Sequence, residues 1–127
     1  MATLITPKIL EPIGFKKHEA VVLSYLINMK KTISRDIEHA CNLRQPEACL
    51  ALRSLTEDGF VKYIEKKSPG KGRPVHIYSV NGKILDLLDL KLGQKQKELS
   101  SDIKKLDEIS RIIKRRQKEQ SQKKMNA

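Results

Sequence analysis

The stretch PEACLALRSLTEDGFVKYIEKKSPGKGRPVHIYSV, residues 46–80, decides the fold because its apolar periodicity changes halfway along. Its first half is helical. Pro46 suits the first position of a helix, and Gly59 suits the left-handed residue that ends one. The apolar side chains between them recur at spacings of three and four, which predicts one buried stripe: Ala48, Leu52 and Leu55. We therefore expect a helix from Pro46 to Asp58.

The second half of this stretch alternates like a strand. Residues 60–67 and 75–80 each place apolar and polar side chains at every second position. Between them lies SPGKGRP, a segment of Gly, Pro and cations that favours a loop. The pattern predicts a β-hairpin with a long projecting loop, and four basic residues surround its tip: Lys66, Lys67, Lys71 and Arg73.

Two further helices are expected upstream. Residues 15–29 carry a wide apolar face at helical spacing, and residues 35–41 form a short helix with Ile37 and Ala40 inward. Ser34 is a suitable N-cap for the short helix, because its hydroxyl can accept from a free backbone N–H. Residues 1–14 are expected to be an irregular lead-in with one helical turn near Pro7.

Downstream of the hairpin, a long helical pattern runs from residue 83 to about residue 118. Apolar residues recur at every seventh position, which is typical of a coiled coil. Lys95 and Asp102 interrupt the seam, and residues 120–127 are expected to fray. We expect this helix to pair two copies of the chain through Leu85, Leu88, Leu92, Leu99, Ile103, Leu106, Ile109 and Ile113.

The charge is concentrated in the hairpin and the C-terminal part. The 127 residues carry a formal net charge of +11, which favours a polyanionic partner. No apolar run is long enough to span a membrane, no signal peptide opens the chain, and Cys41 and Cys49 are expected to be reduced thiols in the cytoplasm. Neither a nucleophile motif nor a phosphate loop is present, so an enzyme is not expected.

No metal or other cofactor is expected either. The side chains that could bind a metal are scattered and lack paired-cysteine spacing: His18, His39, Cys41, Cys49 and His76.

Residues 10–80 resemble the DNA-binding domain of archaeal TrmB-like regulators and, more broadly, the ArsR and MarR families. The resemblance is carried by Ile13-Gly14-Phe15, His18-Glu19-Ala20, residues 32–37, Leu52-Arg53-Ser54-Leu55, Gly59-Phe60-Val61, Gly72-Arg73-Pro74 and Ile77-Tyr78. It implies an α+β, mainly α fold: a winged helix-turn-helix followed by a long dimerisation helix. The corresponding divisions are a lead-in at 1–14, a DNA-binding domain at 15–81 and a helix with a basic tail at 82–127.

The resemblance also implies that the third helix enters the major groove and that the hairpin is the wing. The positions of that helix that would lie toward DNA match Gln45, Glu47, Cys49, Leu50 and Arg53, and Arg44 just precedes them. Gln45 suits adenine or a helix terminus, and Arg44 or Arg53 suits guanine. Glu47 can accept from cytosine, but a carboxylate in the first helical turn more often stabilises the helix dipole.

These observations predict a homodimeric transcriptional regulator that reads double-stranded DNA. One alternative is a winged-helix module that docks on the transcription machinery. Another is a non-specific DNA or RNA binder that uses the basic tail.

Overall fold

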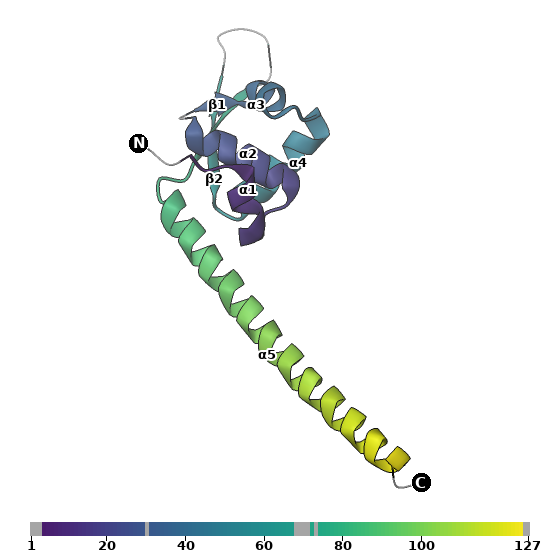
Figure 1. Ribbon diagram of the computed structural model, residues 1–127. Helices are drawn as coiled ribbons and strands as arrows, with labels where there is room; N and C mark the ends of the chain where they lie inside the picture. The colour runs from purple at the N-terminus through teal and green to yellow at the C-terminus, as the bar shows by residue number, and fades with distance from the viewer. Residues whose placement is uncertain (1–3, 30, 68–71, 73, 126–127) are drawn as a thin grey trace. The chain divides into compact units, whose positions relative to one another are not determined.

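The computed structural model describes residues 4–29, 31–67, 72 and 74–125 (Figure 1). The elements are α1 (Pro7–Leu10), the 3-10 helix η1 (Glu11–Ile13), α2 (Lys17–Asn28), β1 (Thr32–Ile33), α3 (Ser34–Cys41), α4 (Gln45–Glu57), β2 (Val61–Lys66), β3 (Val75–Val80) and α5 (Ile84–Met125). After α1 and η1, the three helices α2, α3 and α4, a basic hairpin and a long final helix follow one another as the sequence predicts.

The strands form a small antiparallel sheet in the order β1-β3-β2. In the hairpin, Val61 pairs with Val80 and Lys66 with Val75, so the two long strands match along their whole length. β1 adds Thr32 opposite Tyr78 and Ile33 opposite Ile77. The hairpin thereby joins the segment between α2 and α3, which fixes the base of the hairpin to the helices.

The core lies where α2, α3 and α4 meet the base of the sheet. Its completely buried side chains are aliphatic, as the lack of Trp predicts: Leu10, Val22, Leu23, Leu26, Ile37 and Leu55. The stripe expected on α4 is confirmed, because Ala48 and Leu52 are buried together with Leu55. Gly59 ends α4 with a φ of 84°, the left-handed conformation that favours glycine.

Several local expectations were wrong. Ser34 is the first residue of α3 and Ile33 occupies the cap position, with no side-chain cap bond. Ala40 is exposed, and the half-buried Cys41 occupies the inner side of α3 instead. The expected frayed end is helical as far as Met125, because Gln, Lys and Glu are good helix formers and neither Gly nor Pro interrupts them.

The N-terminal segment is more ordered than an irregular lead-in. α1 and η1 occupy residues 7–13, and Leu10 is completely buried in the core. Gly14 then reverses the chain with a φ of 124°, which places Phe15 edge-to-face against Phe60 at 5.0 Å between ring centroids. The Lys91 ammonium, from the first turns of α5, lies 5.1 Å from the Phe15 ring centroid.

The chain divides into two units, Met1–Leu92 and Gly93–Ala127. The first, the N-terminal unit, contains the core and the beginning of α5, whose Ile84 and Leu88 are buried in it. The rest of α5, from residue 93 to residue 125, is the distal helix. Its side chains are almost all exposed through residue 122.

Candidate nucleic-acid interface

One side of α4 is exposed among the described residues of the N-terminal unit. Its exposed side chains include Gln45, Cys49, Leu50 and Arg53, and Leu50 is 65% exposed. They lie opposite the residues that α4 buries in the core, as expected for an amphipathic helix. Four of the residues expected to face DNA are thus brought together on one accessible surface, which we call the α4 face.

Glu47 is different, because both oxygens of its carboxylate have partners. The backbone N–H of Arg44 donates to Oε1 at 3.1 Å, which closes the first turn of α4. The His18 Nε2 lies 3.1 Å from Oε2. These contacts support the helix-terminus role over the cytosine contact, since both of them hold the carboxylate at the first turn of α4.

A second polar bridge fixes α4 against α2. Glu19 is only 8% exposed, and its Oε2 accepts a hydrogen bond of 2.6 Å from the Ser54 hydroxyl. Its Oε1 accepts from the backbone N–H of Lys16 at 3.0 Å, at the start of α2. Glu19 therefore holds the beginning of α2 and the middle of α4 at a defined separation, so that the α4 face is presented by a rigid support.

A groove of about 650 Å³ lies between the beginning of α2 and the α4 face. Its lining combines cations from α2 with exposed side chains of α4, among them Lys16, Lys17, Leu50 and Arg53. Lysines beside a recognition surface suit phosphate oxygens, since phosphate contacts set the position of a protein on a duplex. Lys16 and Lys17 were not among the predicted site residues, although a Lys-Lys pair at the start of a helix is visible in the sequence.

Another groove, of about 440 Å³, borders the α4 face on the side of the hairpin. Three ring side chains from the hairpin line it together with Cys49 and Arg53: Tyr63, His76 and Tyr78. The His76 ring stacks on Tyr63 at 4.6 Å between centroids. Its Nε2 lies 3.1 Å from Oε1 of Glu65, and its Nδ1 lies 3.5 Å from the Tyr78 hydroxyl.

This ring cluster stiffens the hairpin next to α4. Stacking, the Glu65 contact and the strand pairing all act on neighbouring residues of β2 and β3. Burial raises the pKa of the Tyr78 phenol, and the neighbouring Cys49 and Tyr63 act in the same direction to a smaller extent. The phenol therefore stays protonated near neutral pH and can donate a hydrogen bond. The sequence showed the alternation of β2 and β3, but not that their rings would face α4.

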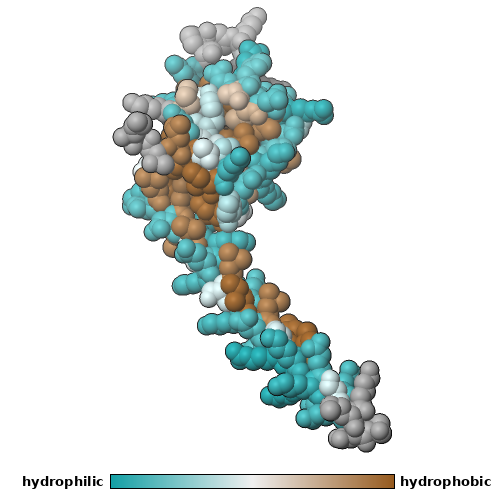
Figure 2. Space-filling view, in the orientation of Figure 1, coloured by the Kyte–Doolittle hydropathy of each residue, from teal (hydrophilic) through white to brown (hydrophobic). Residues whose placement is uncertain are grey.

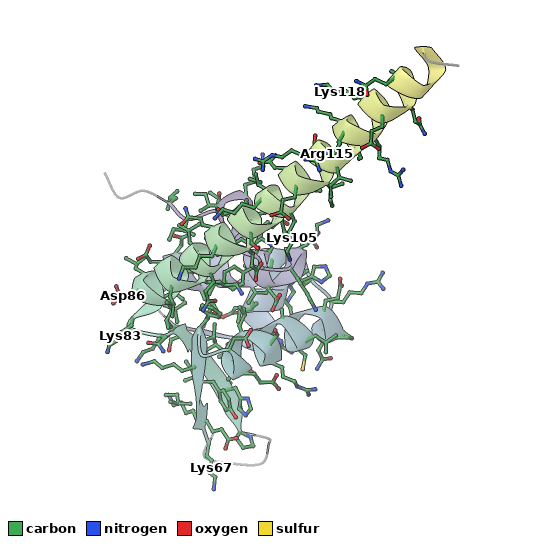
Figure 3. The ribbon with its side chains drawn as sticks, turned by 90° about the horizontal axis from the view of Figure 1, so that it is seen from below. Lys67, Lys83, Asp86, Lys105, Arg115 and Lys118 are labelled. Carbon is green, nitrogen blue, oxygen red and sulfur yellow. The ribbon has the colours of Figure 1, made fainter. Side chains whose placement is uncertain are left out.

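The wing cations are only partly described. Lys66 and Lys67 are exposed, and Figure 3 shows Lys67 at the end of the hairpin that carries the loop. Lys71 and Arg73 were expected to share this role, and they lie outside the described residues. Gly72 is exposed, and a side-chain carbon added there would meet no atom of the described residues within 4 Å.

The residues expected to pair two chains are largely exposed. On the distal helix they are Leu99, Ile103, Leu106, Ile109 and Ile113, all at least half exposed. Figure 2 shows apolar side chains, in brown, between hydrophilic ones along this helix. Leu85 and Leu92 are also exposed, whereas Leu88 is 7% exposed because it completes the core of the N-terminal unit. The pairing role expected of these residues remains a prediction, and Leu88 is the one of them that its own chain already covers.

The two thiols differ in environment. Cys49 is exposed on the α4 face, whereas Cys41 is half-buried with its Sγ 3.8 Å from the Val21 carbonyl oxygen. Burial raises the pKa of the Cys41 thiol. Among the described residues, no helix is both long enough and apolar enough to cross a bilayer.

Comparison with known proteins identifies the architecture. A family model described as sugar-specific transcriptional regulator TrmB matches residues 10–80. Among solved structures, a possible transcriptional regulator from Methanosarcina mazei Go1 is similar at a TM-score of 0.59 and 16% identity, over 76% of this chain and 83% of that one. A protein of the thermoacidophilic archaeon Sulfolobus tokodaii also gives 0.59, at 20% identity, over 76% and 91%.

A third similar structure is TrmBL2, described as an archaeal chromatin protein with a novel mode of DNA binding. It gives a TM-score of 0.54 at 20% identity, over 81% of this chain and 38% of its own. No curated protein matches by sequence. At these identities the structural likeness establishes the fold, and it confirms the predicted winged helix with a long C-terminal helix.

Proposed function

The chain belongs to the TrmB family of transcriptional regulators, and from this premise we propose that it recognises a specific double-stranded DNA sequence as a homodimer. The observation that carries the proposal is the α4 face. It presents Gln45, Leu50 and Arg53 to solvent on a helix whose opposite side is locked into the core. Winged-helix proteins insert such a helix into the major groove.

The chemistry of the α4 face suits base edges. Arg53 can bond the two acceptors of guanine, and Gln45 can bond adenine in the same bidentate way. Leu50 adds an apolar contact that suits a thymine methyl group. A surface of this mixed character reads bases, whereas one made only of cations would bind every sequence alike.

Phosphate contacts would come from both sides of the α4 face. Lys16 and Lys17 line the groove beside α2, and the exposed Lys66 and Lys67 lie at the tip of the hairpin. In this arrangement the wing follows the backbone next to the groove that α4 occupies. The ring cluster of Tyr63, His76 and Tyr78 holds the wing in place.

Pairing through the distal helix supplies the second half-site. Burying a Leu or Ile side chain stabilises by about 1.5–3 kcal/mol, and the exposed row offers several of them. Lys95, at a seam position, lies 3.8 Å from Glu98 of its own helix, and this contact offsets part of the cost of a cation there. Two copies would present two α4 faces and favour an inverted repeat.

Selection from a random duplex library with the full chain tests the proposal. We expect an inverted repeat that is bound at least about 10³-fold more tightly than random duplex at physiological salt. Enrichment of no sequence would refute sequence-specific recognition. Sedimentation at micromolar concentration checks the stoichiometry, and a monomer there would remove the two-half-site mechanism.

A protein-docking role is the second candidate, because Leu50 and Cys49 give the α4 face an apolar centre. The same library experiment separates the two. A protein-docking module would bind every duplex in the library with the same salt-sensitive affinity, so that no sequence is enriched.

A further inference from the structure

The outer side of the distal helix carries a regular row of cations. Lys97, Lys104, Arg111 and Lys118 follow one another at every seventh residue, and all are exposed. Seven residues advance a helix by about 10.5 Å, so the row is about 32 Å long. Its members are therefore spaced evenly along one line of the helix surface, about two turns apart. We call these four residues the basic row.

The basic row lies opposite the apolar row of the same helix. The apolar row consists of Leu99, Leu106 and Ile113. Lys97, Lys104 and Arg111 each lie two residues before a member of the apolar row, and Lys118 lies five residues after the last one. In a heptad this offset is diametrically opposite the seam. Pairing of two helices would therefore cover the apolar side and leave the basic row in solvent. A single helix would leave it exposed as well.

The neighbours of the basic row are also polar. Two heptad positions flank the row on the helix surface. From residue 93 to residue 122 they are occupied by Gly93 and otherwise by polar or charged residues alone. The flanking side chains include Ser100, Ser101, Lys114 and Arg115, and the two acidic ones are Asp107 and Glu108. Figure 3 shows Arg115 and Lys118 among the side chains that extend from this helix.

The members of the basic row are not neutralised by ion pairs within the part of the chain that the structure describes. The ion pair found on the distal helix joins Lys95 to Glu98, and neither belongs to the row. Between Lys97 and Lys118 the helix carries eight basic and four acidic side chains, so a positive excess remains. These cations have their donors free for an external anion.

From this placement we propose that the basic row is a second DNA-binding surface, which holds the phosphate backbone of a duplex without reading its sequence. Duplex DNA presents about one phosphate per 1.7 Å of its axis, so a straight row of cations finds acceptors along its whole length. Lys, Arg and Ser are the side chains that bind phosphate oxygens. The surface is distinct from the α4 face and does not depend on the proposed reading of bases.

Other partners fit this placement less well. A helix that lies on a membrane carries Lys or Arg on its polar face and Trp, Phe or Leu on the other. The distal helix has no aromatic side chain to anchor it in the headgroup region. The cores of protein interfaces are enriched in aromatic residues, which the outer side lacks.

The test compares two pairs of substitutions in the full chain. Lys104→Gln with Arg111→Gln removes two charges from the basic row. Lys105→Gln with Arg116→Gln removes the same two residue types from positions outside the row. Binding to a random duplex of about 60 base pairs is followed by fluorescence anisotropy between 50 and 200 mM salt. We expect the row variant to lower the log–log salt slope by about two units, and the control to lower it far less.

Equal slopes in the two variants would overturn the proposal. So would an effect of the row variant that is confined to phosphatidylserine vesicles or to an RNA hairpin. Sedimentation and circular dichroism accompany each measurement, and a second row variant, Lys97→Gln with Lys118→Gln, must reproduce the result. The row variants must lose the same factor of affinity for selected and random duplexes. If instead the α4 face does not read bases, the ratio of the affinities for selected and random duplexes changes and the effect of the row variants does not.

Discussion

The N-terminal unit and the distal helix use the same aliphatic residues in opposite ways. The N-terminal unit buries Leu23, Leu26 and Leu55 completely, whereas the distal helix leaves Leu99 and Leu106 at least half exposed. A unit that buries its own apolar residues has the means to fold alone. A helix that exposes a periodic row of them needs an external surface to cover it. The contrast separates residues that stabilise the fold from residues that the distal helix leaves exposed.

The largest effect expected from this contrast is on stability. Leu55→Ala should lower the free energy of unfolding by about 2–5 kcal/mol, at every protein concentration, because it opens a cavity in the core. Leu106→Ala should lower it in a concentration-dependent way, because the contacts that we propose for Leu106 lie between chains. Urea denaturation at several protein concentrations measures both. If Leu106→Ala lowers the free energy of unfolding equally at every protein concentration, the distal helix does not depend on a second chain and the contrast fails.

The next effect is on association. Leu99→Asp with Leu106→Asp should convert the proposed dimer to a monomer, because pairing would bury each new charge in the seam without a partner. Leu90→Asp is the matched control, since Leu90 is 63% exposed and lies outside the apolar row. Sedimentation velocity reads out both. Dissociation by the Leu90 variant alone would assign pairing to a different side of α5.

A smaller effect, on DNA affinity, is expected from the α4 face. This face differs from both regions because it exposes polar, charged and apolar side chains together. Arg53→Ala should cost about 1–3 kcal/mol at the selected site and little on random duplex. Arg53→Lys keeps the charge but loses the planar fork, so we expect a similar loss of specificity. If the lysine variant binds the selected site normally, Arg53 contacts phosphate rather than a base.

The smallest effect concerns the wing. Lys66→Ala with Lys67→Ala should lower the salt slope by about one unit per residue, on selected and random duplexes alike. Adding Lys71→Ala and Arg73→Ala should extend the loss in the same way. The control is Lys8→Ala with Lys83→Ala, which removes two exposed lysines from α1 and from just before α5. A slope unchanged by the wing variants would show that the hairpin points away from DNA.

Much of the fold was predictable because it rests on local signals. The change of period after Gly59 located β2 and β3, and the spacing of Ala48, Leu52 and Leu55 located the buried side of α4. The α4 face followed from these, since the residues opposite a buried stripe must be exposed.

The rest depends on contacts between distant residues, which leave no periodic trace. α1 is too short to be stable alone, and the burial of Leu10 stabilises it. Leu88 is one of the residues expected from spacing to pair two chains, yet it is buried in the core of its own chain. The Glu19–Ser54 bond joins residues 35 positions apart, and the ring cluster assembles from two strands.

The two cysteines have a practical consequence for spectroscopy. Cys49 is exposed in the middle of the α4 face, while Cys41 is half-buried and its pKa is raised by burial. Because thiolates are the reactive form, a maleimide dye near neutral pH should attach to Cys49 first. The unsubstituted chain thus offers a natural attachment point where a fluorophore would sense an arriving duplex, without any engineered cysteine.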